Sequence, residues 1–131
     1  MNGIDTNVLL RLLLRDDSDQ AARADRFIEG SCSADAPCLI NRIVLVEAAW
    51  VLGSGYRYGR EQVATILENI LRTEVFTVED AAEVWAALKA FRASRADFAD
   101  CLIGVGNRAI GATATATFDR AAAALDSFIK I

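Results

Sequence analysis

The chain has 131 residues, of which 53% are hydrophobic, with a single proline and a formal net charge of −4. This length and composition predict one folded domain over residues 1–131 and argue against a disordered chain. No apolar run is long enough for a membrane span, so no membrane insertion is expected. The acidic balance argues against a surface that attracts nucleic acid as a whole. Twelve of the fourteen basic residues are arginines, however, and arginine binds phosphate oxygens bidentately.

The cysteine and histidine content excludes two kinds of site. The chain has no histidine, and its three cysteines form no C-x-x-C pair, so a zinc site has too few ligands and a histidine-based triad is impossible. The cysteines are odd in number and no signal peptide precedes them, which predicts unpaired thiols in a reducing cytoplasm. They are Cys32, Cys38 and Cys101.

Short apolar runs alternate with segments of helical periodicity along the whole chain. In chain order the pattern predicts a strand at 1–4, helices at 7–15 and 19–29, a strand at 38–40, helices at 43–52 and 60–72, a strand at 75–78, helices at 81–91 and 97–110, a strand at 112–117, a helix at 119–125 and a strand at 128–131. The helix at 43–52 is apolar nearly all round, so it should lie in the middle of the protein. This alternation predicts an α/β fold with a parallel sheet between helices.

Two acidic residues directly follow predicted strands. Asp5 comes after the strand at 1–4, and Asp119 comes after the strand at 112–117. Each could simply cap the helix that follows. The carboxyl ends of parallel strands share one edge of a sheet, where ligands bind, so the two carboxylates can also converge on a site.

Three further acids stand in unusual surroundings. Glu47 is the only charge within 43–52, and an ionised carboxylate is costly to bury without a partner, so we expect it to face an internal cleft with a cation nearby. The alternative is a glutamate at the edge of the helix that reaches solvent. Asp97 and Asp100 share one helix face, where like charges repel unless a positive charge lies between them. Asp97 also has an alternative interpretation as a helix cap.

Together these acids predict a magnesium or manganese site. Carboxylate oxygens without histidine or clustered cysteine are the ligands that a hard cation prefers. Such a cation suits phosphoryl chemistry, because it binds the phosphate, activates a water and stabilises the leaving oxygen. The chain contains neither G-x-x-x-x-G-K-[ST] nor G-x-G-x-x-G, so nucleotide binding of those kinds has no support. Metal-assisted phosphodiester hydrolysis is the chemistry that the residues favour.

At this point the sequence resembles a known family, the PIN-domain ribonucleases, and among them the VapC toxins of bacterial toxin–antitoxin pairs. The resemblance covers essentially the whole chain, and its motifs follow the family's order. They are IDTNVLLR at 4–11, DD at 16–17, QAARA at 20–24, IVLVE at 43–47 with WVL at 50–52, ADFADCLI at 96–103 and TFDR at 117–120.

The resemblance implies a PIN-like three-layer α/β/α sandwich with a short central parallel sheet. It implies that the Mg²⁺ or Mn²⁺ site, and with it the catalytic site, consists of Asp5, Glu47, Asp100 and Asp119. The accessory residues that it implies are Asp97, Thr6, Asn7 and Thr117. It further implies an RNA substrate, with transfer and ribosomal RNA both open, a homodimer, and a VapB-type antitoxin that can place a basic side chain in the acidic site.

Some expectations concern the surroundings of the metal site. By proximity in sequence, the arginines that would meet RNA phosphates are Arg11, Arg15, Arg42 and Arg120. Capping of the first helix is expected to fall to Thr6, which would leave the Asp5 carboxylate free for a metal.

Two other classes of function stay open at this level. One is a magnesium-dependent phosphohydrolase acting on a small phosphate ester. The other is a non-catalytic binding module whose acids receive a basic peptide.

Overall fold

The computed structural model describes residues 1–131. Its helices, in chain order, are α1 (Thr6–Leu14), α2 (Ser18–Ser31), α3 (Arg42–Trp50), the π-helix η1 (Val51–Gly55), α4 (Arg60–Arg72), α5 (Ala81–Arg92), α6 (Phe98–Ala109) and α7 (Arg120–Ala123). Its strands are β1 (Cys38–Ile40), β2 (Phe76–Val78), β3 (Thr115–Thr117) and β4 (Phe128–Lys130). None of the helices combines the length and the hydropathy that a bilayer crossing requires.

The predicted elements are confirmed to within a few residues at their ends. The segment 1–4 differs most, because it contributes only a single parallel bridge between Gly3 and Leu39. The helix predicted at 43–52 is divided, since α3 passes directly into η1 at Val51.

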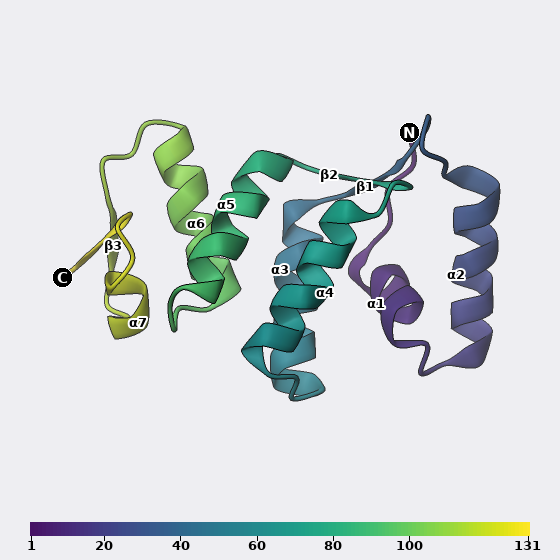
Figure 1. Ribbon diagram of the computed structural model, residues 1–131, viewed down its shortest axis with the longest axis horizontal. Helices are drawn as coiled ribbons and strands as arrows, with labels where there is room; N and C mark the ends of the chain where they lie inside the picture. The colour runs from purple at the N-terminus through teal and green to yellow at the C-terminus, as the bar shows by residue number, and fades with distance from the viewer.

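The strands form two short parallel sheets, and not the one central sheet that was expected. In the first, β1 pairs with β2 in the register Cys38↔Phe76. Gly3 adds a single parallel bridge to Leu39 of β1. In the second, β3 pairs with β4 in the register Thr115↔Phe128. Figure 1 shows β3 and α7 at one end of the long axis of the molecule and α1 and α2 towards the other. The predicted α/β fold with parallel pairing is confirmed, but its strands are divided between two places.

The hydrophobic core lies between α1, α3, α4, α5 and α6. Its largest fully buried aliphatic side chains are Leu9, Ile40, Leu45, Leu52, Leu67, Ile70, Val84 and Leu88. The expectation that α3 is buried all round is wrong, because Ile43 and Trp50 at its two ends are each 69% exposed. The middle of α3 enters the core through one face, and its apolar ends remain at the surface.

Residues 115–131 form what we call the C-terminal unit, and this unit packs on α6. The side-chain amide of Asn107 donates to Oγ1 of Thr115 at 3.0 Å, and the Arg108 guanidinium donates to the Asp126 carbonyl at 2.8 Å. Gly104 provides the closest approach, since a Cβ there would lie 2.6 Å from Cε2 of Phe128. Within the unit only Ala122 is buried, so its attachment to α6 depends on few contacts.

Two of the three cysteines are paired, so the prediction of three free thiols is wrong. Cys32 ends α2, Cys38 begins β1, and the intervening turn brings their Cα atoms to 5.4 Å, where they form a disulfide. The third cysteine, Cys101, is free and buried.

Candidate functional site

Asp5 lies at the carboxyl end of the Gly3 strand and caps α1. Its backbone is extended (φ −90°, ψ 178°), and its carboxylate accepts a hydrogen bond from the Val8 N–H at 3.0 Å. The expectation that Thr6 would provide this cap is wrong, because Thr6 is already the first helical residue. The Thr6 hydroxyl instead donates to Oε1 of Glu47 at 2.8 Å. The capping bond engages one Asp5 oxygen and leaves the other without a protein partner.

Glu47 is exposed and does not face a closed internal cleft, contrary to expectation. It lies on the outer side of α3, where it lines an open groove of about 520 Å³. Asp97 lines the same groove from the segment before α6, and Trp50 and Tyr58 supply apolar walls. The groove therefore holds one acid from α3 and one from the start of α6.

A second group of acids lies where α6 meets the C-terminal unit. Asp97 caps α6 by accepting from the Asp100 N–H at 2.8 Å, and Asp119 caps α7 by accepting from the Ala122 N–H at 2.8 Å. The Thr117 hydroxyl accepts from the Asp119 N–H at 2.9 Å and so fixes the turn after β3. Burial raises the pKa of Asp100, and the neighbouring charges of Asp97 and Asp119 raise it further. The three carboxylates therefore act on one another.

The predicted acids thus stand in two groups within one chain. The first is Asp5 with Glu47, joined through Thr6, and the second is Asp97, Asp100 and Asp119. Neither Asp5 nor Glu47 is among the charges that shift the pKa of Asp100. No three acidic or other ligating side chains lie close enough together to hold a metal ion. Asp5 and Asp119 do not converge, because the strands that carry them belong to different sheets.

Three of the four arginines expected to bind RNA are already paired. Arg11 contacts Gln20 and Asp16, and Arg15 forms two hydrogen bonds with Asp25. Arg120 has no ion pair. Arg11 also lines a hollow of about 550 Å³ between α1 and α2; its other polar lining residues are Asp5, Asn7, Gln20 and Arg23.

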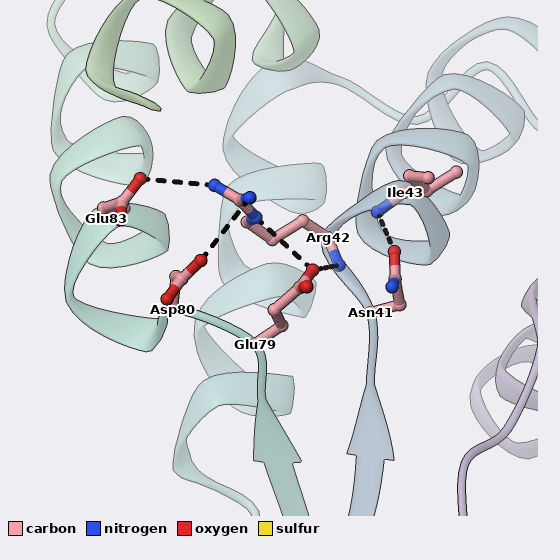
Figure 2. A network of polar contacts seen from close by, with 6 residues as sticks. All are labelled: Asn41, Arg42, Ile43, Glu79, Asp80 and Glu83. Atoms are coloured by element: carbon pink, nitrogen blue, oxygen red, sulfur yellow. Dashed lines mark hydrogen bonds and ion pairs between the residues drawn. The ribbon is translucent and has the colours of Figure 1, made fainter. Parts of the chain in front are cut away.

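Arg42 is held by three carboxylates at the carboxyl ends of β1 and β2 (Figure 2). Its guanidinium pairs with Glu79 at 3.4 Å, Asp80 at 3.4 Å and Glu83 at 3.2 Å. The backbone N–H of Arg42 also donates to the Glu79 carboxylate at 3.0 Å. Asn41, beside it, caps α3 through the Ile43 N–H at 2.7 Å. Arg42 is therefore committed within the protein.

The sequence reasoning missed this acidic cluster. Glu79 and Asp80 directly follow strand β2, just as Asp5 follows its strand, and this shared position was the signal that could have identified them. They were interpreted only as acids suited to the start of a helix. Glu79, Asp80 and Glu83 together with Arg42 leave two net negative charges at the sheet edge.

The sequence reasoning also missed Arg60, which holds the segment before Asp97. One terminal nitrogen of its guanidinium donates to the carbonyls of Phe91 (2.7 Å), Ser94 (3.0 Å) and Ala96 (2.7 Å). The guanidinium carbon lies 4.0 Å from the centroid of the Phe91 ring. Arg60 thereby fixes the α5–α6 connection that carries Asp97 and leads into α6, where Asp100 lies.

Comparison with known proteins identifies the family. The chain is similar to a VapC ribonuclease of Aquifex aeolicus (strain VF5), with 28% identity over 120 residues that cover 92% of this chain and 88% of the relative. No solved structure matches the chain. The family model of the PIN domain matches residues 4–127, a range that contains every acid of the two groups. The chain therefore belongs to the PIN-domain family.

Proposed function

We propose that this protein is a Mg²⁺- or Mn²⁺-dependent endoribonuclease that hydrolyses RNA phosphodiester bonds as the toxin of a toxin–antitoxin pair. The observation that carries the proposal is that Asp5 and Asp119, inside the PIN match, both follow parallel strands and cap helices with a single carboxylate oxygen. The second oxygen of each makes no hydrogen bond within the protein, and in α/β proteins ligands bind at the carboxyl ends of the strands. The similarity to a protein named VapC ribonuclease supports RNA as the substrate class.

The chemistry of the donor set fits a hard divalent cation, although its geometry within one chain is incomplete. The residues proposed to hold the ion are Asp5, Glu47, Asp100 and Asp119, all of which offer carboxylate oxygens. Such an ion, when bound, lowers the pKa of a coordinated water and stabilises charge on phosphate. One chain holds these donors in two groups.

The chain's own residues prepare this chemistry in three ways. The Thr6 hydroxyl orients Glu47, and the Thr117 hydroxyl fixes the backbone of Asp119. Burial and then the charges of Asp97 and Asp119 raise the pKa of Asp100, and a cation would favour the ionised carboxylate by relieving this repulsion. Asn7 stands beside Asp5 in the hollow between α1 and α2 and is proposed to orient the substrate or the attacking water.

We propose that RNA phosphates approach along the arginines of this surface. Arg11 and Arg23 line the hollow next to Asp5, and Arg120 lies unpaired beside Asp119. Guanidinium groups bind phosphate oxygens bidentately, so these three would guide a strand between the two groups of acids. Arg15 and Arg42 are proposed to shape the surface through their ion pairs and not to contact RNA directly.

The proposed partners follow from the same resemblance. A VapB-type antitoxin would neutralise the enzyme by placing a basic side chain among the acids. Residues 1–131 would form a single PIN domain, and the protein would work in the cytoplasm as a homodimer. The RNA target is left open between transfer RNA and ribosomal RNA.

The test is a cleavage assay on structured RNAs with Mg²⁺, with Mn²⁺ and with EDTA. Cleavage that needs the metal and is lost in Asp5→Asn and Asp100→Asn, while circular dichroism is unchanged, supports the proposal. Asp35→Asn, in an exposed loop outside both groups, is the matched control. Unimpaired cleavage by Asp5→Asn would overturn the assignment. Hydrolysis of a phosphomonoester without RNA cleavage would indicate a phosphohydrolase that acts on small esters. Metal binding without any turnover would indicate a non-catalytic binding module.

A further inference from the structure

The hollow between α1 and α2 combines groups that recognise a nucleotide. It encloses about 550 Å³, which lies within the range of about 300–1,000 Å³ that small-molecule sites occupy. Arg11 and Arg23 line it together with Phe27, which is 39% exposed. Asp5, one of the proposed metal ligands, lines the same hollow. A nucleotide placed here would have its phosphate beside guanidinium groups, which bind phosphate oxygens well.

Arg11 is held by the protein on one side and keeps free donors on the other. Its Nε donates to Oε1 of Gln20 at 2.7 Å, and its Nη1 donates to Oδ1 of Asp16 at 3.1 Å. A guanidinium has further N–H donors, so these two bonds leave the rest for a ligand. Arg23, by contrast, has a side chain that is 67% exposed and pairs only with Asp19, at 3.7 Å. Arg11 is therefore the preorganised phosphate donor of the hollow, and Arg23 is an adaptable one.

Tyr56 completes the hold on Arg11 from a distant part of the chain. Its hydroxyl donates to Oδ2 of Asp16, so both oxygens of this carboxylate are occupied. The same hydrogen bond lowers the pKa of Asp16, which keeps the carboxylate charged for Arg11. Tyr56 is itself fixed, because its N–H donates to the Val51 carbonyl at 3.1 Å at the end of η1 and its ring packs edge-on against Tyr58. Single π-helical turns of this kind often occur at functional sites.

Phe27 and two side-chain amides supply a surface for a base. An aromatic ring can stack on a nucleobase of any sequence, provided that the base is not already stacked in a duplex. Gln20 is fixed through its Oε1 by Arg11, so its Nε2 is left to donate to a base edge, and Asn7 adds a second amide to the lining. The hollow therefore offers separate places for the phosphate and for the base of a single-stranded nucleotide.

We infer that this hollow binds one single-stranded nucleotide of the RNA next to the cleaved bond, with its phosphate on Arg11 and its base against Phe27. Tyr56 acts through Asp16 as a positioning residue that holds Arg11 for the phosphate. The place of this nucleotide in an RNA strand rests on the proposed ribonuclease function, whereas the binding of a free nucleotide does not. The hollow contributes to the binding of the substrate and not to the chemical step.

The nucleotide site is tested with free ligands in EDTA, where no metal-dependent cleavage takes place. NMR spectroscopy on the full chain follows the Nε–H of Arg11 and the ring protons of Phe27 while AMP or inorganic phosphate is added. AMP should shift both signals, whereas inorganic phosphate should shift the signal of Arg11 alone and bind more weakly. AMP that moves neither signal, or that binds no tighter than inorganic phosphate, overturns the inference.

Variants separate the contributions of the base and of the phosphate. Phe27→Leu keeps an apolar side chain and loses the flat ring, so the affinity for AMP should fall about 10-fold while that for inorganic phosphate is unchanged. Tyr56→Phe loses only the hydroxyl and should weaken the binding of both ligands about 5-fold. Tyr58→Phe removes the hydroxyl of the neighbouring ring and is the matched control, in which both affinities should be unchanged.

Each variant can contradict its own part of the inference. Wild-type affinity for AMP in Phe27→Leu would show that no base stacks on this ring, and wild-type affinities in Tyr56→Phe would show that Tyr56 does not position Arg11. Circular dichroism checks that the variants fold. Asp16→Asn, which keeps an acceptor for Arg11 but loses the charge, is a second variant for the positioning role and should also weaken the binding of both ligands.

Steady-state cleavage connects the nucleotide site with the proposed function. In Phe27→Leu and Tyr56→Phe the KM for RNA should rise about 5- to 10-fold while kcat changes by less than about 2-fold, because these side chains bind RNA and do not act on the reacting bond. Tyr58→Phe should keep both constants. A lower kcat with an unchanged KM in Phe27→Leu and Tyr56→Phe would overturn the inference.

The outcomes separate the two proposals. If wild-type protein binds AMP through Arg11 and Phe27 but cleaves no RNA, the proposed function fails and the nucleotide site stands. If wild-type protein cleaves RNA but AMP moves neither signal and Phe27→Leu keeps its KM, the proposed function stands and this inference fails.

Discussion

The Thr6 hydroxyl donates a hydrogen bond to Oε1 of Glu47 at 2.8 Å and so links the start of α1 to the middle of α3. Forty-one positions separate the two residues in sequence. The bond fixes one glutamate oxygen and joins the position of Glu47 to that of Asp5, which is the residue before Thr6. It makes the first group of acids a unit.

Replacement of Thr6 by valine should weaken activity far more than stability. Valine keeps the shape and loses the hydroxyl, so Glu47 is no longer oriented. If Glu47 is a metal ligand as proposed, the group that orients it should contribute about 10-fold or more to activity, whereas an exposed hydrogen bond contributes at most about 1 kcal/mol to folding. Cleavage rates and urea denaturation measure the two effects. Thr6→Ser keeps the donor and should retain most activity; equal losses in both variants would contradict the role of the hydroxyl.

Replacement of Arg60 by alanine should destabilise the protein by about 1–3 kcal/mol, because the carbonyls at the end of α5 and before Asp97 lose a charged donor. Urea denaturation followed by circular dichroism measures this change in the free energy of unfolding. Arg26→Ala removes an exposed arginine of α2 that makes no side-chain hydrogen bond or ion pair, and it should change stability by less than about 0.5 kcal/mol. Similar effects of the two variants would show that the contacts of Arg60 are unimportant.

Replacement of Gly104 by alanine should loosen the C-terminal unit. The new methyl group would meet side-chain atoms of Ser127 and Phe128, and overpacking of this kind costs about 1–3 kcal/mol. Thermal unfolding and proteolysis near residue 115 report the effect. Gly30→Ala is the matched control, since nothing lies within 4 Å of its added Cβ and alanine suits the interior of α2 better than glycine. A variant of Gly104 as stable as wild type would contradict this close packing.

Replacement of Asp100 by asparagine should raise the melting temperature at pH 7 by a few degrees while abolishing activity. The pKa of Asp100 is raised in the folded protein, first by burial and then by Asp97 and Asp119. Its ionised form therefore costs stability, and this cost grows as the pH rises from the unfolded pKa of about 3.9 through the folded pKa. Below both values the carboxyl is neutral and the advantage of asparagine should vanish.

Melting curves of wild type and the Asp100 variant at pH 7 and near pH 3 check this sign. Asp35→Asn, in an exposed loop, is the control and should shift neither curve. A lower melting temperature for Asp100→Asn at pH 7 would mean that a favourable contact of the carboxylate outweighs the repulsion.

The cysteines should label in a fixed order with iodoacetamide at pH 8. Burial raises the pKa of the Cys101 thiol to about 11, so the native protein should stay unlabelled because thiolate is the reactive form. Unfolding without reductant should expose one thiol, and unfolding with reductant all three, since Cys32 and Cys38 are joined. Mass spectrometry counts the adducts. Three adducts without reductant would show that the disulfide is absent.

The sequence by itself determined the elements and the residue types of the site. Helical and strand periodicity is local, so helices such as α4 and strands such as β1 were predicted at their observed bounds. The PIN motifs likewise depend only on residues in order, and the match over residues 4–127 confirms the family that they indicated. Asp97 was recognised in advance as a possible cap for the same reason, because capping involves residues three positions apart.

Only the tertiary structure decided which of these residues meet. The pairing of Thr6 with Glu47, of Arg42 with three acids, and of Cys32 with Cys38 depends on how separate segments pack. The same holds for the sheets, because a strand's pattern shows that it pairs and not with which neighbour. Asp5 and Asp119 were expected to converge, yet β3 pairs with β4 alone and keeps them in separate groups. Long-range pairing is set by the sum of many packing contacts, and no local pattern in the sequence records that sum.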